Sequence, residues 1–274
     1  GRDARRHFFV DGAFEEKWFS EFYRRGPSLG HSRCRYYAMT DALSSSSSAL
    51  MQPLQAGCAA LGLALTAQQM TQLLEFLALL QKWNKVYNLT AVRNPQDMLT
   101  HHLLDSLAAV GPLQRHLASL PADASAPPCL LDVGSGGGLP GVVFAICCPQ
   151  LQVSCVDTVA KKAAFIQQAA ASLGLRNLRG IHARVESLQQ SYDVVSCRAF
   201  ASLLDFTTWS RAALAPQGIW LAMKGQHPQE EMAALPSQVQ VLNVEALAVP
   251  GLPAQRCIVW MRPAPSPTPA SKTW

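Results

Sequence analysis

The sequence predicts an α/β protein in which helices wind on both faces of a seven-stranded, mostly parallel sheet, after a small N-terminal helical part. Three observations predict this class. Short apolar runs alternate with helical stretches from residue 129 onward, as in proteins with parallel sheets. A glycine-rich segment, "DVGSGGGLPG" (132–141), follows the first apolar run. Hydrophobic residues make up 49% of the 274-residue chain, which is enough for a large core.

Helices are predicted before the sheet. After Thr66, apolar side chains recur at three- and four-residue steps, which indicates an amphipathic helix that Thr66 can cap. A second helical stretch is expected over about 95–110, with Asn94 as its cap and Pro95 in its first turn. The Gly-Pro pair at 111–112 is then expected to break the chain. The sheet therefore begins only after these two helical stretches.

The strands are expected in short apolar runs bounded by turn residues, which is typical of strands buried on both faces. They are predicted at 129–134, 151–157, 178–183, 192–199, 218–225, 240–249 and 255–262. Helices are expected at 139–148 and 160–173. The chain is thus divided into an extension over 1–53 that is disordered or upstream of the true start, a helical part over 54–126, a sheet domain over 127–263 and a Pro-rich tail over 264–274.

Composition excludes several classes of protein. The net charge of +5 is modest, so contact with nucleic acid would need a local basic patch. None of the eight cysteines are spaced as C-x-x-C, and most fall in apolar runs, which indicates buried thiols rather than a zinc site or disulfides. No apolar stretch reaches the roughly 18 residues of a membrane span, and no secretory signal opens the chain. We therefore expect a cytoplasmic protein that binds no membrane and no metal.

The glycine segment follows a strand and precedes a helix, where α/β proteins present backbone N–H groups to a ligand. Its glycines include the dinucleotide pattern G-x-G-x-x-G at Gly136, Gly138 and Gly141, and Asp157 follows at the end of the next strand. This pattern alone fits an NAD enzyme. Asp132 favours a methyl donor instead, because a carboxylate suits the cationic amino-acid part of S-adenosylmethionine better than a pyrophosphate. The alternative is that Asp132 only holds the turn by hydrogen bonds.

The ends of the third and fourth strands are expected beside the same crevice. Val185 and Glu186, in "HARVES", are placed to flank an adenine, although Glu186 could equally be a solvent-facing residue at a helix start. Arg198, in "SCRAF", lies at the carboxyl end of the fourth strand, which favours a functional role. The crevice is thus expected to hold both a cofactor and a substrate.

At this point several segments resemble the bacterial small-subunit ribosomal RNA guanine-N7 methyltransferases, the RsmG or GidB family. The matching segments are "KWNKVYNLTAV" (82–92), "MLTHHLLDS" (98–106), "LLDVGSGGGLPG" (130–141), "VDT" (156–158), "ARVES" (183–187), "SCRAFAS" (196–202) and "MKGQ" (223–226). The glycine motif is shared by class I methyltransferases in general, whereas the first and sixth segments are far more specific. One departure is His101, where relatives often have arginine.

The resemblance implies a Rossmann-like, class I S-adenosylmethionine-dependent methyltransferase that modifies one guanine in the small-subunit RNA. Together with the loop pattern, it predicts a set of cofactor contacts. These are Gly134, Ser135, Gly136, Gly138, Leu139, Asp157, Val185, Glu186 and Arg198. The expected partner is the ribosomal RNA or a ribosomal particle, and the protein is expected to be a monomer.

Methylation of guanine N7 needs neither a general base nor a metal, because N7 carries a free lone pair. The enzyme's task is then to position the reactants. We expect Arg198 and Lys224 to be the catalytic residues, holding the guanine or its phosphate in orientation. Phe200 would either stack on the base or belong to the core. Cys197 is expected to be a buried, inert thiol rather than a nucleophile.

The RNA-facing patch is expected after the first helix. Its predicted RNA-binding residues are Lys85, Asn88 and His102, supported by Lys82, Arg93 and His101. Without the family resemblance, a solvated helix face would be the simpler interpretation. Trp83 and Tyr87 are expected to pack between the helical part and the sheet.

Other functions remain open from the residues alone. An NAD-dependent oxidoreductase would need an acid–base pair such as Tyr-x-x-x-Lys, which does not appear. A non-catalytic regulator would be expected to have a degraded glycine loop, whereas this loop is intact. A methyltransferase that acts on another RNA, a protein or a small molecule is the nearest alternative.

Overall fold

The computed structural model describes residues 49–120 and 126–265. The extension expected over 1–53 therefore lies outside the described residues up to position 48, and so does most of the tail expected over 264–274. A helix covers residues 49–60, so the boundary expected between 53 and 54 falls inside it. This helix packs into the core through buried Leu54 and Cys58. In the part that the structure describes, no helix is long and apolar enough to span a membrane.

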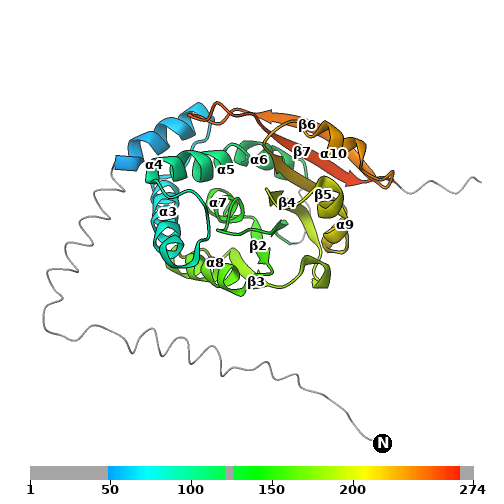
Figure 1. The fold of residues 1–274 in the computed structure, drawn as a ribbon, viewed down its shortest axis with the longest axis horizontal. Helices are drawn as coiled ribbons and strands as arrows, with labels where there is room; N and C mark the ends of the chain where they lie inside the picture. Colours follow the sequence, from blue (N-terminus) through cyan, green and yellow to red (C-terminus); the bar gives the residue numbers. More distant parts are fainter. Residues whose placement is uncertain (1–48, 121–125, 266–274) are drawn as a thin grey trace, which may run out of the picture. The chain divides into compact units, whose positions relative to one another are not determined.

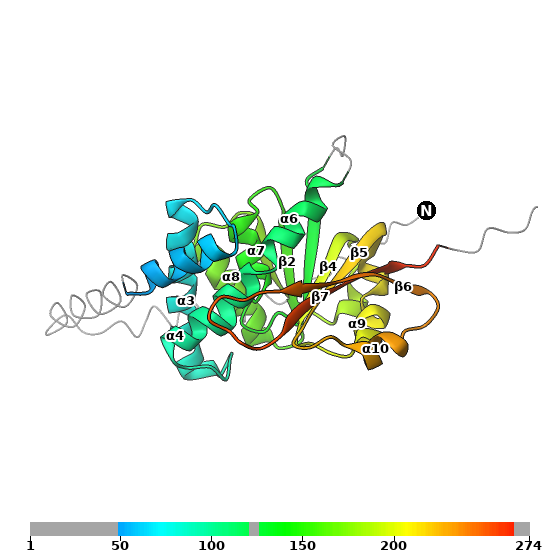
Figure 2. The same cartoon turned by 90° about the horizontal axis from the view of Figure 1, so that it is seen from above.

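One seven-stranded sheet forms the centre of the molecule (Figures 1 and 2). Its strands are β1 (Cys129–Val133), β2 (Gln152–Asp157), β3 (Leu178–His182), β4 (Tyr192–Arg198), β5 (Leu214–Lys224), β6 (Val239–Leu247) and β7 (Arg256–Pro263). Their order across the sheet is β3-β2-β1-β4-β5-β7-β6. Pairing is parallel from β3 to β5, and β7 is antiparallel to both β5 and β6. The predicted class, a mostly parallel sheet with seven strands, is confirmed.

Helices and short helical turns connect these strands. They are α3 (Ala67–Tyr87), α4 (Pro95–Met98), the π-helix η1 (Leu99–Leu104), α5 (Asp105–Leu107), α6 (Val110–Ala118), α7 (Gly141–Cys147), α8 (Ala160–Ser172), η2 (Val185–Ser187), α9 (Leu203–Trp209), η3 (Arg211–Ala213) and α10 (Gln229–Ala233). The first helices pack on one face of the sheet together with α7 and α8, and α9 covers the other face (Figures 1 and 2).

Each face of the sheet has its own hydrophobic core. In β1, Leu130 belongs to the cluster under α3, α7 and α8, and the next residue, Leu131, belongs to the cluster under α9. This alternation follows from the two-residue period of a strand. Trp83 and Tyr87 pack at the edge of the first cluster, where Trp83 contacts Phe165 of α8 with ring centroids 5.4 Å apart. Their predicted packing role is confirmed.

The helix ends show which local signals were correct. Thr66 caps α3 and forms a capping box with Gln69, and the Asn94 side chain caps α4 with Pro95 in its first turn, as predicted. The break predicted at the Gly-Pro pair 111–112 is wrong, because α6 runs through it. Pro112 is the third residue of α6, where a helix has no partner for the backbone N–H that proline lacks.

Candidate active site

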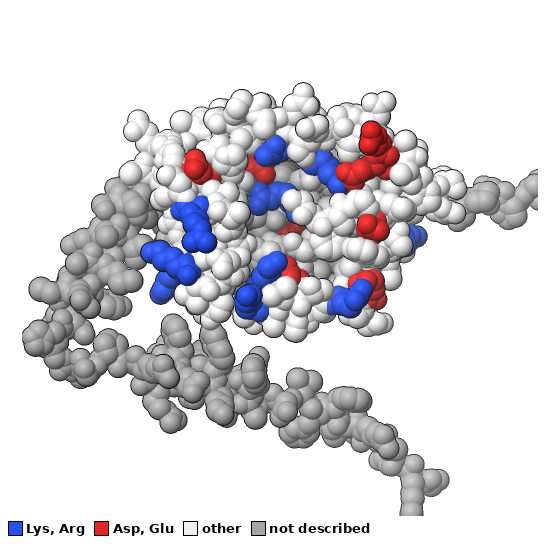
Figure 3. Space-filling view, in the orientation of Figure 1, with Lys and Arg blue, Asp and Glu red and all other residues white. Residues whose placement is uncertain are grey.

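The site lies where the strand order reverses. β1 stands between β2 and β4, so the chain leaves β1 toward one side of the sheet and leaves β4 toward the other. In α/β sheets, ligands bind beyond the carboxyl ends of strands at such a point. Gly134 follows β1 and Arg198 ends β4, so both come to this edge. Figure 3 shows the corresponding face, which is hollowed near its middle.

The glycine loop needs its glycines for backbone conformation. Gly134, Gly136 and Gly138 have φ angles of 66°, 56° and 79°, a region that side chains disfavour. Most loop amides donate within the protein: those of Gly134 and Ser135 to Val156 O, and those of Gly138 and Leu139 to Ser135 O. The loop thus satisfies most of its N–H groups within the protein, and the expectation that it holds a ligand stays a prediction. A loop in this state lacks the anion nest that a pyrophosphate needs.

Asp132 lies beneath the loop and holds it in place. Its carboxylate is completely buried and accepts hydrogen bonds from Ser135 Oγ at 2.5 Å, Ser196 Oγ at 2.9 Å and the Gly141 amide at 3.1 Å. These partners tie β1 to β4, to the loop and to the start of α7. Burial raises the pKa of Asp132 to about 6. The structure thus supports the alternative in which Asp132 fixes the turn, rather than direct contact with a ligand.

Asp157 ends β2 beside the same loop. Its Oδ2 accepts the Gly136 amide at 3.1 Å and lies 3.7 Å from Lys162 Nζ, and its Oδ1 accepts the Val159 amide at 2.9 Å. The carboxylate is therefore held rigidly at the strand end where a ribose was expected.

The segment after β3 forms the short turn η2. Val185 is buried there, whereas Glu186 is exposed and pairs with Arg184 at 2.9 Å. This pairing lowers the pKa of Glu186. The Glu186 carboxylate lies against Arg184, and its contact with an adenine stays a prediction.

Arg198 belongs to an ion-pair network that the sequence did not reveal. Its Nη1 donates to Asp105 Oδ2 at 2.8 Å and to the His101 carbonyl at 3.1 Å. The other oxygen of Asp105 accepts from Arg256 Nε at 2.8 Å. One buried carboxylate thus fixes two guanidinium groups at the carboxyl edge of the sheet and leaves a net positive charge there.

Phe200 covers part of the glycine loop. A side-chain carbon at Gly134 would overlap the Phe200 ring, so the ring lies directly on the bare glycine. The preceding residue, Ala199, has a φ of 50°, which is unusual for a residue with a side chain. The ring also packs edge-on against Trp209, with centroids 5.9 Å apart. Phe200 therefore lies between the core on the α9 side and the candidate site.

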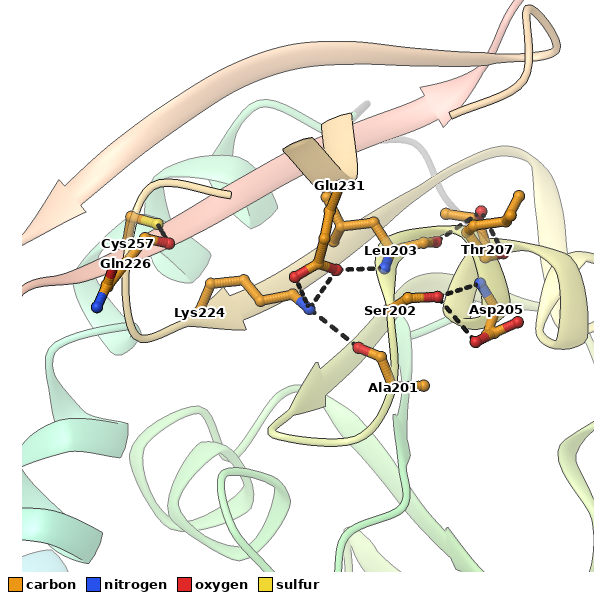
Figure 4. A network of polar contacts seen from close by, with 10 residues as sticks. Ala201, Ser202, Leu203, Asp205, Thr207, Lys224, Gln226, Glu231 and Cys257 are labelled. Atoms are coloured by element: carbon orange, nitrogen blue, oxygen red, sulfur yellow. Dashed lines mark hydrogen bonds and ion pairs between the residues drawn. The ribbon is translucent and has the colours of Figure 1, made fainter. Parts of the chain in front are cut away.

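Lys224 does not point into an open crevice (Figure 4). Its Nζ donates to both carboxylate oxygens of Glu231, at 3.0 and 2.7 Å, and to the Ala201 carbonyl at 2.9 Å. An ammonium has three donors, and these three contacts use them. In this structure Lys224 connects β5, α10 and the loop after β4, and its predicted contact with the substrate stays a prediction.

His102 is buried and does not reach the surface. Its side chain is only 7% exposed, and its Nε2 lies 2.7 Å from Thr90 Oγ1. Burial, with the nearby charge of Arg198, lowers the pKa of His102 to about 4. The prediction that His102 faces RNA is therefore wrong. It packs in the π-helix whose carbonyl at His101 holds Arg198.

The other two predicted RNA-binding residues, Lys85 and Asn88, are exposed at the end of α3. Asn88 ends the helix in the left-handed conformation, and its Oδ1 accepts from Arg93 Nη2 at 3.1 Å. Lys161, in the first turn of α8, lies 6.0 Å from the ring of Tyr87. Figure 3 shows basic side chains on the α3 and α8 side of the hollow and acidic side chains gathered toward α9 and α10.

Cys197 is buried in β4, and burial raises its pKa far above the usual range. Its predicted burial is confirmed. The seven cysteines among the described residues are free thiols, and Cys34 lies outside that part of the chain.

Sequence comparisons identify the family of the chain. The model of the family described as "rRNA small subunit methyltransferase G" (GidB) matches residues 69–259. The chain belongs to this family. Proteins named ribosomal RNA small subunit methyltransferase G are 73% identical over 77% of this chain and 94% of their own length in Acidovorax sp. (strain JS42), and 72% identical over 78% and 90% in Paracidovorax citrulli.

Similarity to solved structures is lower. A Burkholderia thailandensis 1,6-didemethyltoxoflavin-N1-methyltransferase superposes with a TM-score of 0.46 and 17% identity, over 74% of this chain and 92% of that chain.

The family match covers the glycine loop, Arg198 and Lys224, and it also covers residues that sequence reasoning did not single out. These are Thr90, Asp105, Ser196, Glu231 and Arg256. Asp105 lies inside the "MLTHHLLDS" segment, which is one of the segments that resemble the family. Its position in that segment is the sequence feature that could have indicated a role in the site. Arg256 had no such signal, because its place depends on the reversed direction of β7.

Proposed function

We propose that the protein transfers the methyl group of S-adenosylmethionine to N7 of a guanine in small-subunit ribosomal RNA. The observation that carries this proposal is the glycine loop at the switch point. Its amides are largely satisfied within the protein, and a carboxylate stands at the neighbouring strand end. Such a site suits a cofactor without phosphate and disfavours the pyrophosphate of NAD.

The chemistry of the neighbouring side chains fits S-adenosylmethionine. Asp157 has acceptor capacity for ribose hydroxyl groups, and buried Val185 offers an apolar surface for an adenine. Gly134, Ser135, Gly136, Gly138 and Leu139 would form the floor of the cofactor site, with Arg198 at its rim and Glu186 free to turn from Arg184 toward the adenine. When bound, the cofactor supplies a sulfonium-activated methyl group.

The residues of the chain would then bind and orient the guanine. Arg198, fixed by Asp105, would donate to guanine O6 or to the phosphate and leave N7 free for attack. Because N7 attacks with its own lone pair, no side chain has to remove a proton. Holding the two reactants in line is the main catalytic contribution, which can reach about 7 to 11 kcal/mol in favourable cases.

The RNA would approach from the α3 and α8 side. Lys85 and Asn88 are exposed there, and Lys161 lies across from Tyr87. Phosphates favour this basic side over the acidic side formed by α9 and α10. His102 would contribute by packing beneath the site rather than by touching RNA.

The test uses the full chain with isotope-labelled S-adenosylmethionine and small ribosomal subunits from a strain that lacks the activity. Nucleosides released by digestion are then examined by mass spectrometry. We expect label in 7-methylguanosine and a loss of more than about tenfold in Arg198→Ala. Arg262→Ala, which removes an exposed arginine of β7 bonded to Gln240, is the matched control and should keep full activity. Label in another nucleoside would contradict the N7 assignment.

A further inference from the structure

We propose that Glu231 is a positioning residue: through Lys224 it fixes the connection between β4 and α9 and thereby holds Phe200 on the glycine loop. The inference rests on the proposed function for its effect on catalysis. Figure 4 shows the arrangement, with Glu231 of α10 facing Lys224 of β5 and the start of α9.

The connection from Ala199 to Ser202 is held at both of its ends. At its start, Arg198 is bound by Asp105 and by the His101 carbonyl. At its end, Lys224 and Glu231 bind the Ala201 carbonyl and the Leu203 amide. The segment between these anchors carries the ring that lies on Gly134.

At the second anchor, the ion pair between Lys224 and Glu231 makes two contacts with the backbone. Lys224 Nζ donates to the Ala201 carbonyl at 2.9 Å, and Glu231 Oε2 accepts the Leu203 amide at 2.7 Å. Leu203 is the first residue of α9, so its amide has no partner inside the helix. The carboxylate of Glu231 therefore completes the helix start as well as pairing with the lysine.

Phe200 depends on this anchor because the backbone of the residue before it, Ala199, is strained. Ala199 adopts a left-handed conformation that costs free energy for a residue with a side chain. Such a conformation persists only where the surroundings hold it. Without the carbonyl contact at Ala201, the segment can relax and the ring can leave Gly134.

The alternative role of Lys224 is direct contact with RNA. Its side chain is only 15% exposed and its three donors are used, so contact with a phosphate would require breaking the pair with Glu231. The two roles make different predictions for a pair of substitutions. If the two residues act only as a positioning pair, the double variant loses no more activity than a single variant. If Lys224 also contacts the substrate, its replacement lowers the activity further in the double variant.

The experiment compares Glu231→Gln, Lys224→Met and the double variant in the full chain. Glu230→Gln is the matched control, since this neighbouring glutamate of α10 is exposed and forms no ion pair within the described residues. For methyl transfer to small subunits, we expect kcat to fall about tenfold or more in each single variant, with KM for the subunits within about twofold of wild type. The double variant should lose no more than the worse single variant.

Hydrogen exchange gives a readout that does not depend on activity. Amides of residues 199–203 should exchange faster in Glu231→Gln and remain as in wild type in Glu230→Gln. Multiplicative losses in the double variant, a change mainly in KM, or unchanged exchange in Glu231→Gln would each overturn the proposal. If the wild type itself fails to methylate small subunits, the proposed function fails, while the exchange experiment still tests the anchor.

Discussion

At the scale of single residues, the charges around the site are paired with one another rather than left open. Asp105 is the centre of this pairing, because it binds Arg198 and Arg256 with its two oxygens. The sequence predicted that Arg198 is important but could not show what holds it. The partner is 93 residues away along the chain, and only the fold brings the two together.

Replacing Asp105 by Asn should affect both stability and activity. Two guanidinium groups would lose their common counter-charge in a largely buried place, which we expect to lower the free energy of unfolding by about 1–3 kcal/mol. Arg198 would also lose its fixed orientation, so methyl transfer should fall. Asp97→Asn, an exposed position in α4, serves as the control in urea unfolding and in the transfer assay. Equal behaviour of the two variants would contradict the bridging role.

Two buried groups should change the free energy of unfolding in opposite directions as the pH rises. The pKa of Asp132 is raised to about 6, so between pH 4 and 6 the folded state keeps a proton that the unfolded state releases. Stability from this group is therefore lost as the pH rises. The pKa of His102 is lowered to about 4, so the unfolded state binds a proton there that the folded state does not. Stability from His102 is lost as the pH falls.

Replacing His102 by Gln should remove the part of the pH dependence that comes from His102 and leave the part that comes from Asp132. Relative to wild type, the free energy of unfolding of this variant should fall as the pH rises from 4 toward 6.5, by at most about 1.4 kcal/mol per pH unit. Urea unfolding at several pH values measures the difference. Parallel curves for the two proteins would show that the imidazole is not kept neutral by its surroundings.

At the scale of elements, the glycine loop and the helix after it form one close-packed unit. Gly141 begins α7, and a side-chain carbon there would overlap Cys155 Sγ and lie 3.0 Å from Asp132 Oδ2. The need for glycine at this position therefore comes from close approach, not from backbone conformation.

The substitution Gly141→Ala should lower the free energy of unfolding by about 1–3 kcal/mol through overpacking. Adding Cys155→Ala removes the sulfur atom that would overlap the new side-chain carbon at position 141. The double variant should therefore be no less stable than Gly141→Ala, although Cys155→Ala alone is destabilising. Thermal unfolding of the three variants measures this coupling, and simple addition of the two losses would argue against the collision.

Most elements could be predicted from the sequence because their signals are local. Periodicity and capping residues located α3 and α4, and apolar runs located all seven strands to within a few residues. The direction of β7 could not be predicted, since an apolar run reads the same in a parallel and an antiparallel strand. The positions of Gly134 and Arg198 at strand ends were predicted correctly, because a sequence motif marks each of them. The sequence could not show side-chain burial or partners distant in the sequence, such as the burial of His102 and the pairing of Lys224 with Glu231.

At the scale of the whole molecule, the N-terminal helices and the sheet share one core. The hydrophobic cluster on the α3 side of the sheet includes Leu54 of the first described helix together with Leu130 of β1. The helical part and the sheet domain are therefore expected to unfold together rather than as separate domains.

The variant Leu54→Ala tests whether the helical part and the sheet domain unfold together. Leu54 is completely buried, so we expect a loss of about 2–5 kcal/mol in the free energy of unfolding. The transition should remain single, with β1 amides losing protection in step with those of α3. Leu242→Ala, at an exposed position of β6, should change stability by less than about 0.5 kcal/mol. A melt in two steps would show that the helical part is an independent domain.

The reversed strand β7 also brings a late segment of the sequence to the site. Because β7 runs antiparallel, its first residue, Arg256, arrives at the edge where Asp105 and Arg198 already wait. Asp105 and Arg198 both precede Arg256 in the sequence, and the glycine loop and the first five strands precede it as well. Arg256 is therefore the last of these three charges along the chain, and a truncation before β7 would take away one of the two arginines that Asp105 binds.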